Sequence, residues 1–186
     1  KHPNPILSDA KVRKALSIAI DRGLLAEIGY GQAGKPTCNL VPAPESWASD
    51  NTACLTQDQD AARALLDEAG WVPGSDGVRE KDGKRLKLVF QTSVNAVRQD
   101  FQALIKQWWQ EIGVETELKT IDAGVYFGSD AGSPDTLQRF YADIEMYANF
   151  FEGANPEPSL AKNICKQSPG PDNQWQGENT SRYCDE

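Results

Sequence analysis

Two short segments combine residue types that could bind a small molecule, and each follows a run of residues typical of a β-strand. The first is residues 92–95, with the sequence TSVN, where a strand ending near Phe90 gives way to a helix. Ser93 or Asn95 could cap that helix and still present polar groups to a ligand, and Arg98 lies one turn further on. Ordinary capping beside a solvated arginine is the simpler alternative. Asn95 and Arg98 are therefore the first candidate ligand-binding residues.

The second segment is residues 147–152, with the sequence YANFFE, at the end of a short expected strand that starts at residue 143. Aromatic rings, an amide and a carboxylate that leave a strand together suit a wall that stacks against a ligand and hydrogen-bonds to it. The alternative is that Phe150 and Phe151 are core residues of the loop. The candidate ligand-binding residues of this segment are Tyr147, Asn149, Phe150 and Glu152.

The sequence offers little for catalysis. Asp143 and Glu145 are two apart on an expected strand, so both would point to one face and could form a carboxylate pair. A Ser/His/Asp triad would have to use His2, the one histidine of the chain, and no serine lies in a GxSxG motif. A phosphate-binding loop is absent as well. We therefore expect no enzyme, no catalytic residue and no cofactor.

The four cysteines fall into two local pairs, in loops rich in proline, glycine and asparagine. Neither pair has the CxxC spacing of a zinc or redox site, and one histidine leaves little else to bind a metal. We expect two disulfides, Cys38 with Cys54 and Cys165 with Cys184, although three pairings are formally possible and four reduced thiols are the alternative. Disulfides would place the protein outside the cytosol.

Length and charge narrow the class of protein further. The 186 residues suffice for one domain with a core, and the net charge of −8 comes without a basic stripe, so nucleic acid is not expected as a partner. No apolar run approaches the length of a membrane helix, and no signal peptide precedes the first residues. We therefore expect a processed or excised piece, with residues 1–186 forming a single domain.

Hydrophobic periodicity predicts alternating helices and strands. An amphipathic helix is expected to start at Asp9 with Ser8 as its N-cap, and Asp21 should cap a continuation. The other expected elements are, in chain order, helix 57–69, a strand ending near residue 90, helix 95–112, strand 114–121, helix 123–128, strand 143–147 and one or two helical turns near 158–164. This order predicts an α/β fold with a mostly parallel sheet flanked by helices.

A β-hairpin is expected near residues 78–90. The pair Asp82-Gly83 lies between two strand-like arms, and both central residues of a type I′ turn need positive φ, which aspartate and glycine tolerate. The second arm is expected to continue as one strand through Phe90.

The order of three segments resembles a known family. These are NPILSDAKVRKALSIAIDR at the start, LLDEAGWVPGSDGVREKDGKRLKLVF in the middle and VRQDFQALIKQWWQEIGVETELK after it, and the later segment DIEMYANFFEGANPEPSL fits the same order. Together they resemble the C-terminal lobe of extracytoplasmic solute-binding proteins of the peptide/nickel/oligopeptide class (family 5), which feed ABC importers. The resemblance implies a periplasmic binding protein type II-like lobe, cut out at both ends, over nearly the whole chain.

The same resemblance implies the partners and the location. A second lobe of the same protein would close over a peptide, oligosaccharide or metal chelate, and the closed form would deliver it to the permease subunits of the transporter. The full-length protein would be periplasmic or on the cell surface, with a lipid anchor. Peptide-binding members carry an aspartate that pairs with the peptide amine; without gaps Glu152 takes its position, whereas one gap shifts the position to Ala154.

A protein-interaction module without a small ligand remains the alternative from another class. The loop-rich tail, residues 166–184, would then be the contact surface. This tail also contains Asn179-Thr180-Ser181, which matches the N-glycosylation sequon, although such a short motif often arises by chance.

Overall fold

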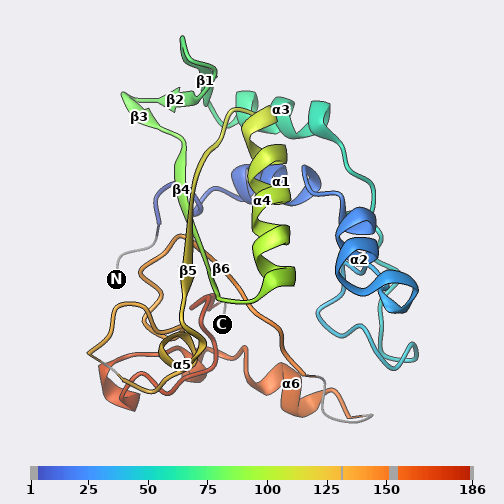
Figure 1. Ribbon diagram of the computed structural model, residues 1–186, viewed down its shortest axis with the longest axis vertical. Helices are drawn as coiled ribbons and strands as arrows, with labels where there is room; N and C mark the ends of the chain where they lie inside the picture. The colour runs from blue at the N-terminus through green and yellow to red at the C-terminus, as the bar shows by residue number, and fades with distance from the viewer. Residues whose placement is uncertain (1–3, 131, 151–154, 185–186) are drawn as a thin grey trace.

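A parallel three-stranded sheet forms the centre of the computed structural model, which describes residues 4–130, 132–150 and 155–184. The strands are Lys87–Ser93 (β4), Glu115–Ile121 (β5) and Ile144–Met146 (β6), in the order β5-β4-β6. β4 pairs along its whole length with β5 and, from Phe90 to Thr92, with β6. The predicted α/β class with a parallel sheet, flanking helices and a hairpin is confirmed (Figure 1).

The main core lies between this sheet and four helices. Ala96–Glu111 (α4) connects β4 to β5, and Ala10–Ile18 (α1), Arg22–Tyr30 (α2) and Gln59–Glu68 (α3) pack around it. The ring of Trp109 contacts Phe90 of the sheet, and its Nε1 donates a 2.9 Å hydrogen bond to the carbonyl of Leu16. Among the described residues, no helix combines the length and the apolar character needed to cross a membrane.

A second, smaller apolar cluster gathers around the end of β5. It contains Ile121, Tyr126 and Leu137, with Tyr147 packed against them. Tyr126 belongs to the short helix Ala123–Tyr126 (α5). The rest of the tail holds Glu157–Ala161 (α6) and the single-turn 3₁₀ helices Cys165–Gln167 (η2) and Pro171–Asn173 (η3); another such turn, Gly31–Ala33 (η1), follows α2.

The predicted hairpin turn is confirmed, but the predicted continuous second arm is wrong. Val72–Pro73 (β1), Arg79–Lys81 (β2) and Lys84–Arg85 (β3) form a separate antiparallel sheet. Asp82 and Gly83 have φ values of 51° and 72°, as a type I′ turn requires. The arm breaks at Leu86, whose N–H donates to the Arg79 carbonyl of the hairpin, while its carbonyl accepts from Glu115 N–H of β5. One buried residue thus links the two sheets.

Arg79 anchors the hairpin to α3 and α4. Its side chain is 4% exposed, and its Nε donates a 2.8 Å hydrogen bond to the carbonyl of Ile112 at the end of α4. Its Nη1 contacts the Asp67 carboxylate of α3 and the carbonyl of Trp71. Gly113 has φ of 85°, and a Cβ there would lie 2.7 Å from Cγ of Arg79. Only glycine leaves room for this buried cation.

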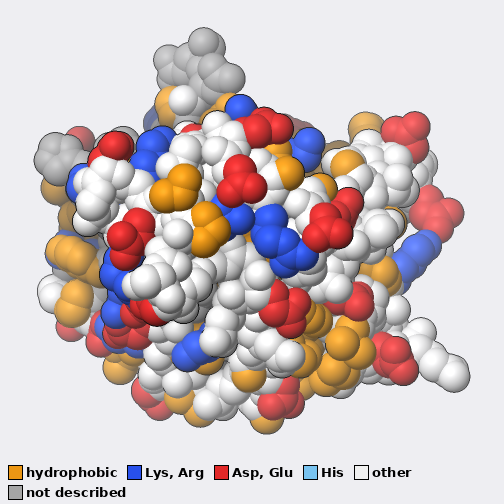
Figure 2. Space-filling model, turned by 90° about the horizontal axis from the view of Figure 1, so that it is seen from above, with side chains coloured by type: hydrophobic (Ala, Val, Ile, Leu, Met, Phe, Trp, Pro, Cys, Tyr) orange, Lys and Arg blue, Asp and Glu red, His pale blue; other side chains and the backbone are white. Residues whose placement is uncertain are grey.

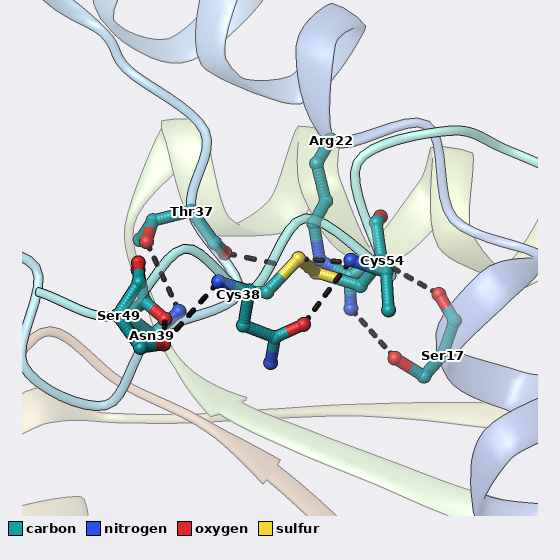
Figure 3. The surroundings of a disulfide bond; sticks show 9 residues. Ser17, Arg22, Thr37, Cys38, Asn39, Ser49 and Cys54 are labelled. Carbon is teal, nitrogen blue, oxygen red and sulfur yellow. Dashed lines mark hydrogen bonds between the residues drawn. A yellow bond between two sulfur atoms is a disulfide. The ribbon is translucent and has the colours of Figure 1, made fainter.

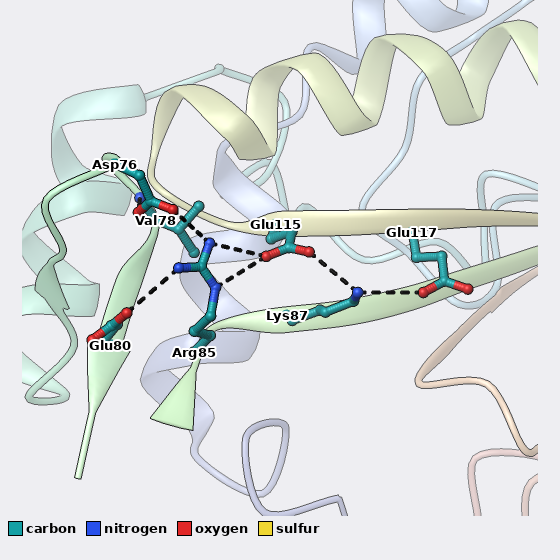
Figure 4. A network of polar contacts seen from close by, with 7 residues as sticks. All are labelled: Asp76, Val78, Glu80, Arg85, Lys87, Glu115 and Glu117. Carbon is teal, nitrogen blue, oxygen red and sulfur yellow. Dashed lines mark hydrogen bonds and ion pairs between the residues drawn. The ribbon is translucent and has the colours of Figure 1, made fainter. Parts of the chain in front are cut away.

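A surface network of ion pairs adds a second attachment between the hairpin and β5 (Figure 4). Arg85 contacts Asp76 at 2.8 Å, Glu115 at 3.1 Å and Glu80 at 3.5 Å. The hydrogen bond from Arg85 lowers the pKa of Asp76, and the bond from Lys87 lowers the pKa of Glu115. Since these groups are exposed, each pair contributes little to stability. Acidic and basic side chains also intermix over the face seen in Figure 2.

Several helix starts differ from the prediction by one or two residues. Asp9, not Ser8, is the N-cap of α1, because its carboxylate accepts from Lys11 N–H while its own backbone is extended. The expected helix 57–69 begins at Gln59, after the N-cap Asp58. Asp21 caps α2 as predicted.

Both predicted disulfides are present. Cys38 bonds to Cys54 and Cys165 to Cys184, closing loops with sequence separations of 16 and 19 residues. The four-thiol alternative is therefore wrong in this structure.

The asparagine of the glycosylation sequon is a buried structural residue. Asn179 is 1% exposed, and its Nδ2 donates to the carbonyls of Asn163, Ile164 and Tyr183 at 2.9–3.3 Å. Its Oδ1 accepts from Ser181 Oγ. The amide nitrogen that a glycan would need is thus occupied in the folded tail.

Replacing Cys165 and Cys184 together with serine should lower the free energy of unfolding by about 3 kcal/mol, because the denatured chain loses a loop constraint of this size. Urea denaturation of the variant and the parent would measure the difference. An unchanged midpoint would show that the tail does not share the stability of the domain.

Replacing Asn179 with alanine should lower the opening free energy of the tail by about 2 kcal/mol, because it leaves buried carbonyls without donors. Hydrogen exchange of residues 163–184 would report this local opening. Gln176→Ala is the control, since Gln176 is exposed and its amide makes one long 3.5 Å contact within the described chain. Equal protection in both variants would contradict the structural role of Asn179.

Candidate functional site: the carboxyl edge of the sheet

The three parallel strands end at one edge of the sheet, and the candidate residues follow these ends. β4 ends at Ser93, β5 at Ile121 and β6 at Met146, in adjacent register positions. In open α/β sheets, ligands bind beyond the carboxyl ends of the strands. In Figure 1 this edge is the lower end of the sheet, opposite the hairpin.

Asn95 and Arg98 open helix α4 at this edge. Asn95 is the N-cap, and its Oδ1 accepts a 3.1 Å hydrogen bond from Arg98 N–H. The Arg98 side chain turns back to the strand end, where its Nη2 donates a 3.0 Å hydrogen bond to Oγ of buried Ser93. Its Nε is buried and has no hydrogen-bond partner among the described residues. The capping alternative is thus correct for Asn95, but Arg98 is not simply solvated.

Buried Tyr126 and half-buried Glu145 lie at the same edge. The ring of Tyr126 is fully buried, and its hydroxyl lies 3.4 Å from the carbonyl of Met146, which also accepts a 2.6 Å bond from Thr92 Oγ1. Burial raises the pKa of Tyr126 far above its usual range; the charge of Glu145 adds to this rise, and Arg98 opposes it. These groups therefore act on one another electrostatically.

The segment after β6 lies partly against the small apolar cluster and partly at the surface. Tyr147 packs against the small apolar cluster and is half-buried. Asn149 is exposed, with its Oδ1 accepting from Phe150 N–H, and Phe150 is 82% exposed. The alternative that Phe150 is a core residue is therefore wrong. Phe151, Glu152 and Ala154 lie outside the described residues.

Asp143 and Glu145, the two residues that could form a carboxylate pair, make hydrogen bonds that support the fold. Asp143 accepts hydrogen bonds from Val89 N–H at 2.8 Å and from Asn4 Nδ2, and so joins the start of β6 to β4 and to the N-terminal segment. Glu145 accepts from Gln91 Nε2 at 3.4 Å. Within the described chain, no group of three or more His, Cys, Asp or Glu side chains could hold a metal ion. His2 lies outside that part.

The sequence did not predict Tyr126 as part of this edge. Tyr126 stood in a segment recognised only as a short helix, and its contact with Met146 joins residues 20 apart. Thr92 belongs to the predicted segment 92–95, and its hydroxyl donates to the Met146 carbonyl, on the face opposite Ser93.

Comparison with known proteins identifies the family. Residues 1–163 match the model of "Bacterial extracellular solute-binding proteins, family 5 Middle". The chain belongs to this family. It is 27% identical over 165 residues to the dipeptide-binding protein of Escherichia coli. The alignment covers 80% of this chain and 29% of that protein.

Solved structures of family 5 proteins agree with the fold. An ABC transporter substrate-binding protein from Sinorhizobium meliloti aligns with a TM-score of 0.69 and 29% identity, over 86% of this chain and 30% of that one. Lactococcal OppA, complexed with an endogenous peptide in the closed conformation, aligns with a TM-score of 0.63 and 29% identity, over 72% of this chain and 27% of that one. The chain thus spans less than a third of each of these relatives.

The comparison also tests the interpretation of the chain as an enzyme. The family description is of extracellular solute-binding proteins, and these relatives are binding proteins rather than enzymes. The family-5 resemblance predicted from the sequence is confirmed.

The raised pKa of Tyr126 predicts a loss of stability at alkaline pH. The unfolded chain releases the tyrosine proton near pH 10, whereas the folded chain holds it to higher pH, so stability is full below pH 10 and falls above it. We expect this one group to contribute a slope of about 1.4 kcal/mol per pH unit. Urea unfolding of Tyr126→Phe and the parent between pH 9 and 11.5 would measure it. Parallel curves would contradict the burial effect.

Proposed function

We propose that this chain is one lobe of an extracytoplasmic solute-binding protein that captures a peptide, or a similar oligomeric solute, by cleft closure and delivers it to the permease of an ABC importer. Its family membership supports this proposal, as do relatives named for dipeptide and oligopeptide binding. The full-length protein would be held at the cell surface or in the periplasm by a lipid anchor. The carboxyl edge of the sheet would form this lobe's wall of the solute cleft.

The observation that best supports the proposal is the buried Arg98 Nε–H, which has no acceptor among the described residues. A buried N–H group without an acceptor costs about 1–3 kcal/mol, and a carboxylate beside a guanidinium forms a strong, charge-assisted hydrogen bond. The Arg98 guanidinium has a hydroxyl partner, Ser93, and no carboxylate within 4 Å in the described chain. An anionic group of the solute would supply the acceptor that the lobe alone lacks.

The segment after β6 would contribute the second part of the wall. Phe150 exposes most of its ring, which a solute could cover by stacking, and Asn149 lies next to it at the surface. Glu152 would pair with a solute amine, as the aspartate does in peptide-binding members. Together these residues would hold a solute with both an amine and a carboxylate, as a peptide has. Exposed aromatic rings suit sugars as well, so oligosaccharide is the second candidate.

In the described chain β6 pairs on one side only, which supports the packing of a second lobe or another part of the protein here. β6 pairs on one side with β4, and an open, largely apolar cavity of 310 Å³ adjoins it, lined by Ile20, Phe90, Ile105, Trp109 and residues 144–147. Exposed apolar surface beside a strand edge is usually covered in a complete protein.

A thermal-shift titration of the complete protein with short peptides tests this function. At 100 times the dissociation constant, a bound peptide should stabilise the fold by about 2.7 kcal/mol. Arg98→Gln should weaken binding of a peptide with a free carboxyl end by tenfold or more, because a charged hydrogen bond is lost. Amidating the peptide should weaken its binding to the parent but not its binding to Arg98→Gln.

Gln99→Ala is the matched control, since Gln99 is an exposed neighbour on the same helix. Peptides that bind Arg98→Gln as tightly as the parent would remove Arg98 from the wall. Stabilisation by oligosaccharides and not by peptides would favour the second candidate, and no stabilisation by either would favour an interaction module.

A further inference from the structure

A cavity lined by both polar and apolar groups lies away from the carboxyl edge, beside the first disulfide. It has a volume of 520 Å³ and lies between the junction of α1 and α2 and the two limbs of the loop that Cys38–Cys54 closes. Lys14 and Arg22 line its helix side, and hydroxyl and amide side chains line much of the rest. None of the described residues around it is acidic, although the chain has 27 acidic and 19 basic residues. The cavity is therefore a cationic site in an anionic protein.

Arg22 is held rigidly at this cavity. Its Nη1 donates to the carbonyls of Ser17 at 2.7 Å and Cys54 at 3.1 Å, and its Nη2 donates to Ser17 Oγ at 2.9 Å (Figure 3). A guanidinium has five N–H groups, so three are used by these acceptors and two have no acceptor among the described residues. Since three bonds fix its plane, little further entropy is lost when a ligand binds.

All the acceptors of Arg22 are neutral. No carboxylate of the described chain lies within 4 Å of it, and burial lowers its pKa, as expected for a cation removed from water without a counter-ion. Lys14 precedes Ser17 by three residues on α1, so the two side chains share one face of the helix. Lys14 is exposed and has no ion pair with the described residues. Two unpaired positive charges thus face one cavity.

We infer that this cavity binds a small oxyanion, such as inorganic phosphate or the phosphate or sulfate group of a small molecule. Arg22 would form the fixed hydrogen bonds, and Lys14 would supply a mobile second charge. The disulfide positions the Cys54 carbonyl on which Arg22 depends, so the oxidised loop is part of the site. This site is separate from the proposed solute wall, because its residues belong to α1, α2 and the Cys38–Cys54 loop.

Isothermal titration of the purified protein with sodium phosphate, at ionic strength held constant with sodium chloride, tests this inference. We expect saturable binding to the parent and at least tenfold weaker binding to Lys14→Gln, because one charged hydrogen bond is lost. Lys14 is exposed and its replacement should leave the fold intact. Arg22→Lys keeps the charge but loses the planar fork, so it should also weaken binding.

Lys106→Gln is the control for general charge effects, since Lys106 is an exposed lysine on α4 without an ion pair in the described chain. Equal phosphate affinity in Lys14→Gln and the parent would overturn the inference. So would equal weakening in Lys14→Gln and Lys106→Gln, because the effect would then be one of net charge. Neither result depends on the solute cleft, so peptide binding can fail while this site stands.

Discussion

The hydrogen-bond ladder of β4 is the constraint on which the arrangement of this fold depends. β4 is the only strand in the described chain that pairs on both sides within the parallel sheet, and it sets the register of β5 and β6. Because the three strands run in the same direction, this register brings Ser93, Ile121 and Met146 to one edge. Arg98, α5 and the segment after β6 meet there although they are far apart in the chain. A change of one residue in either register would turn the side chains of the shifted strand to the opposite face of the sheet.

The two ends of the sheet are built from different interactions. At the amino end, the buried guanidinium of Arg79 and the glycine beside it lock the hairpin against α3 and α4, and each guanidinium nitrogen of Arg79 has an acceptor in the chain. At the carboxyl end, Arg98 keeps an N–H that has no partner among the described residues, and Phe150 keeps an uncovered ring. Polar and apolar groups left unsatisfied in this way are typical of a surface that is completed by something else.

The hairpin turn, the helix cap at Asn95 and the disulfides could be predicted from the sequence. Contacts between residues far apart in the chain could not. The turn at Asp82-Gly83 and the cap at Asn95 follow from preferences of the residues themselves, and the disulfides from short cysteine spacing. The break at Leu86 could not be predicted, because it depends on hydrogen bonds to Arg79 and to β5, which the run of apolar residues does not encode. The burial of Asn179 could not be predicted for the same reason, because its partners are backbone carbonyls, which every residue has.

The hairpin turn has a consequence for how variation among relatives should be interpreted. Asp82 and Gly83 both adopt positive φ, which aspartate, asparagine and glycine tolerate and most residues do not. Selection for backbone geometry alone would therefore keep these two positions nearly constant, at the end of the sheet opposite the carboxyl edge. Asn149 and Phe150 do not adopt positive φ, so backbone geometry places no such restriction on these two positions. Backbone geometry would thus favour constancy at the hairpin turn and would tolerate variation at the two exposed positions beside the carboxyl edge.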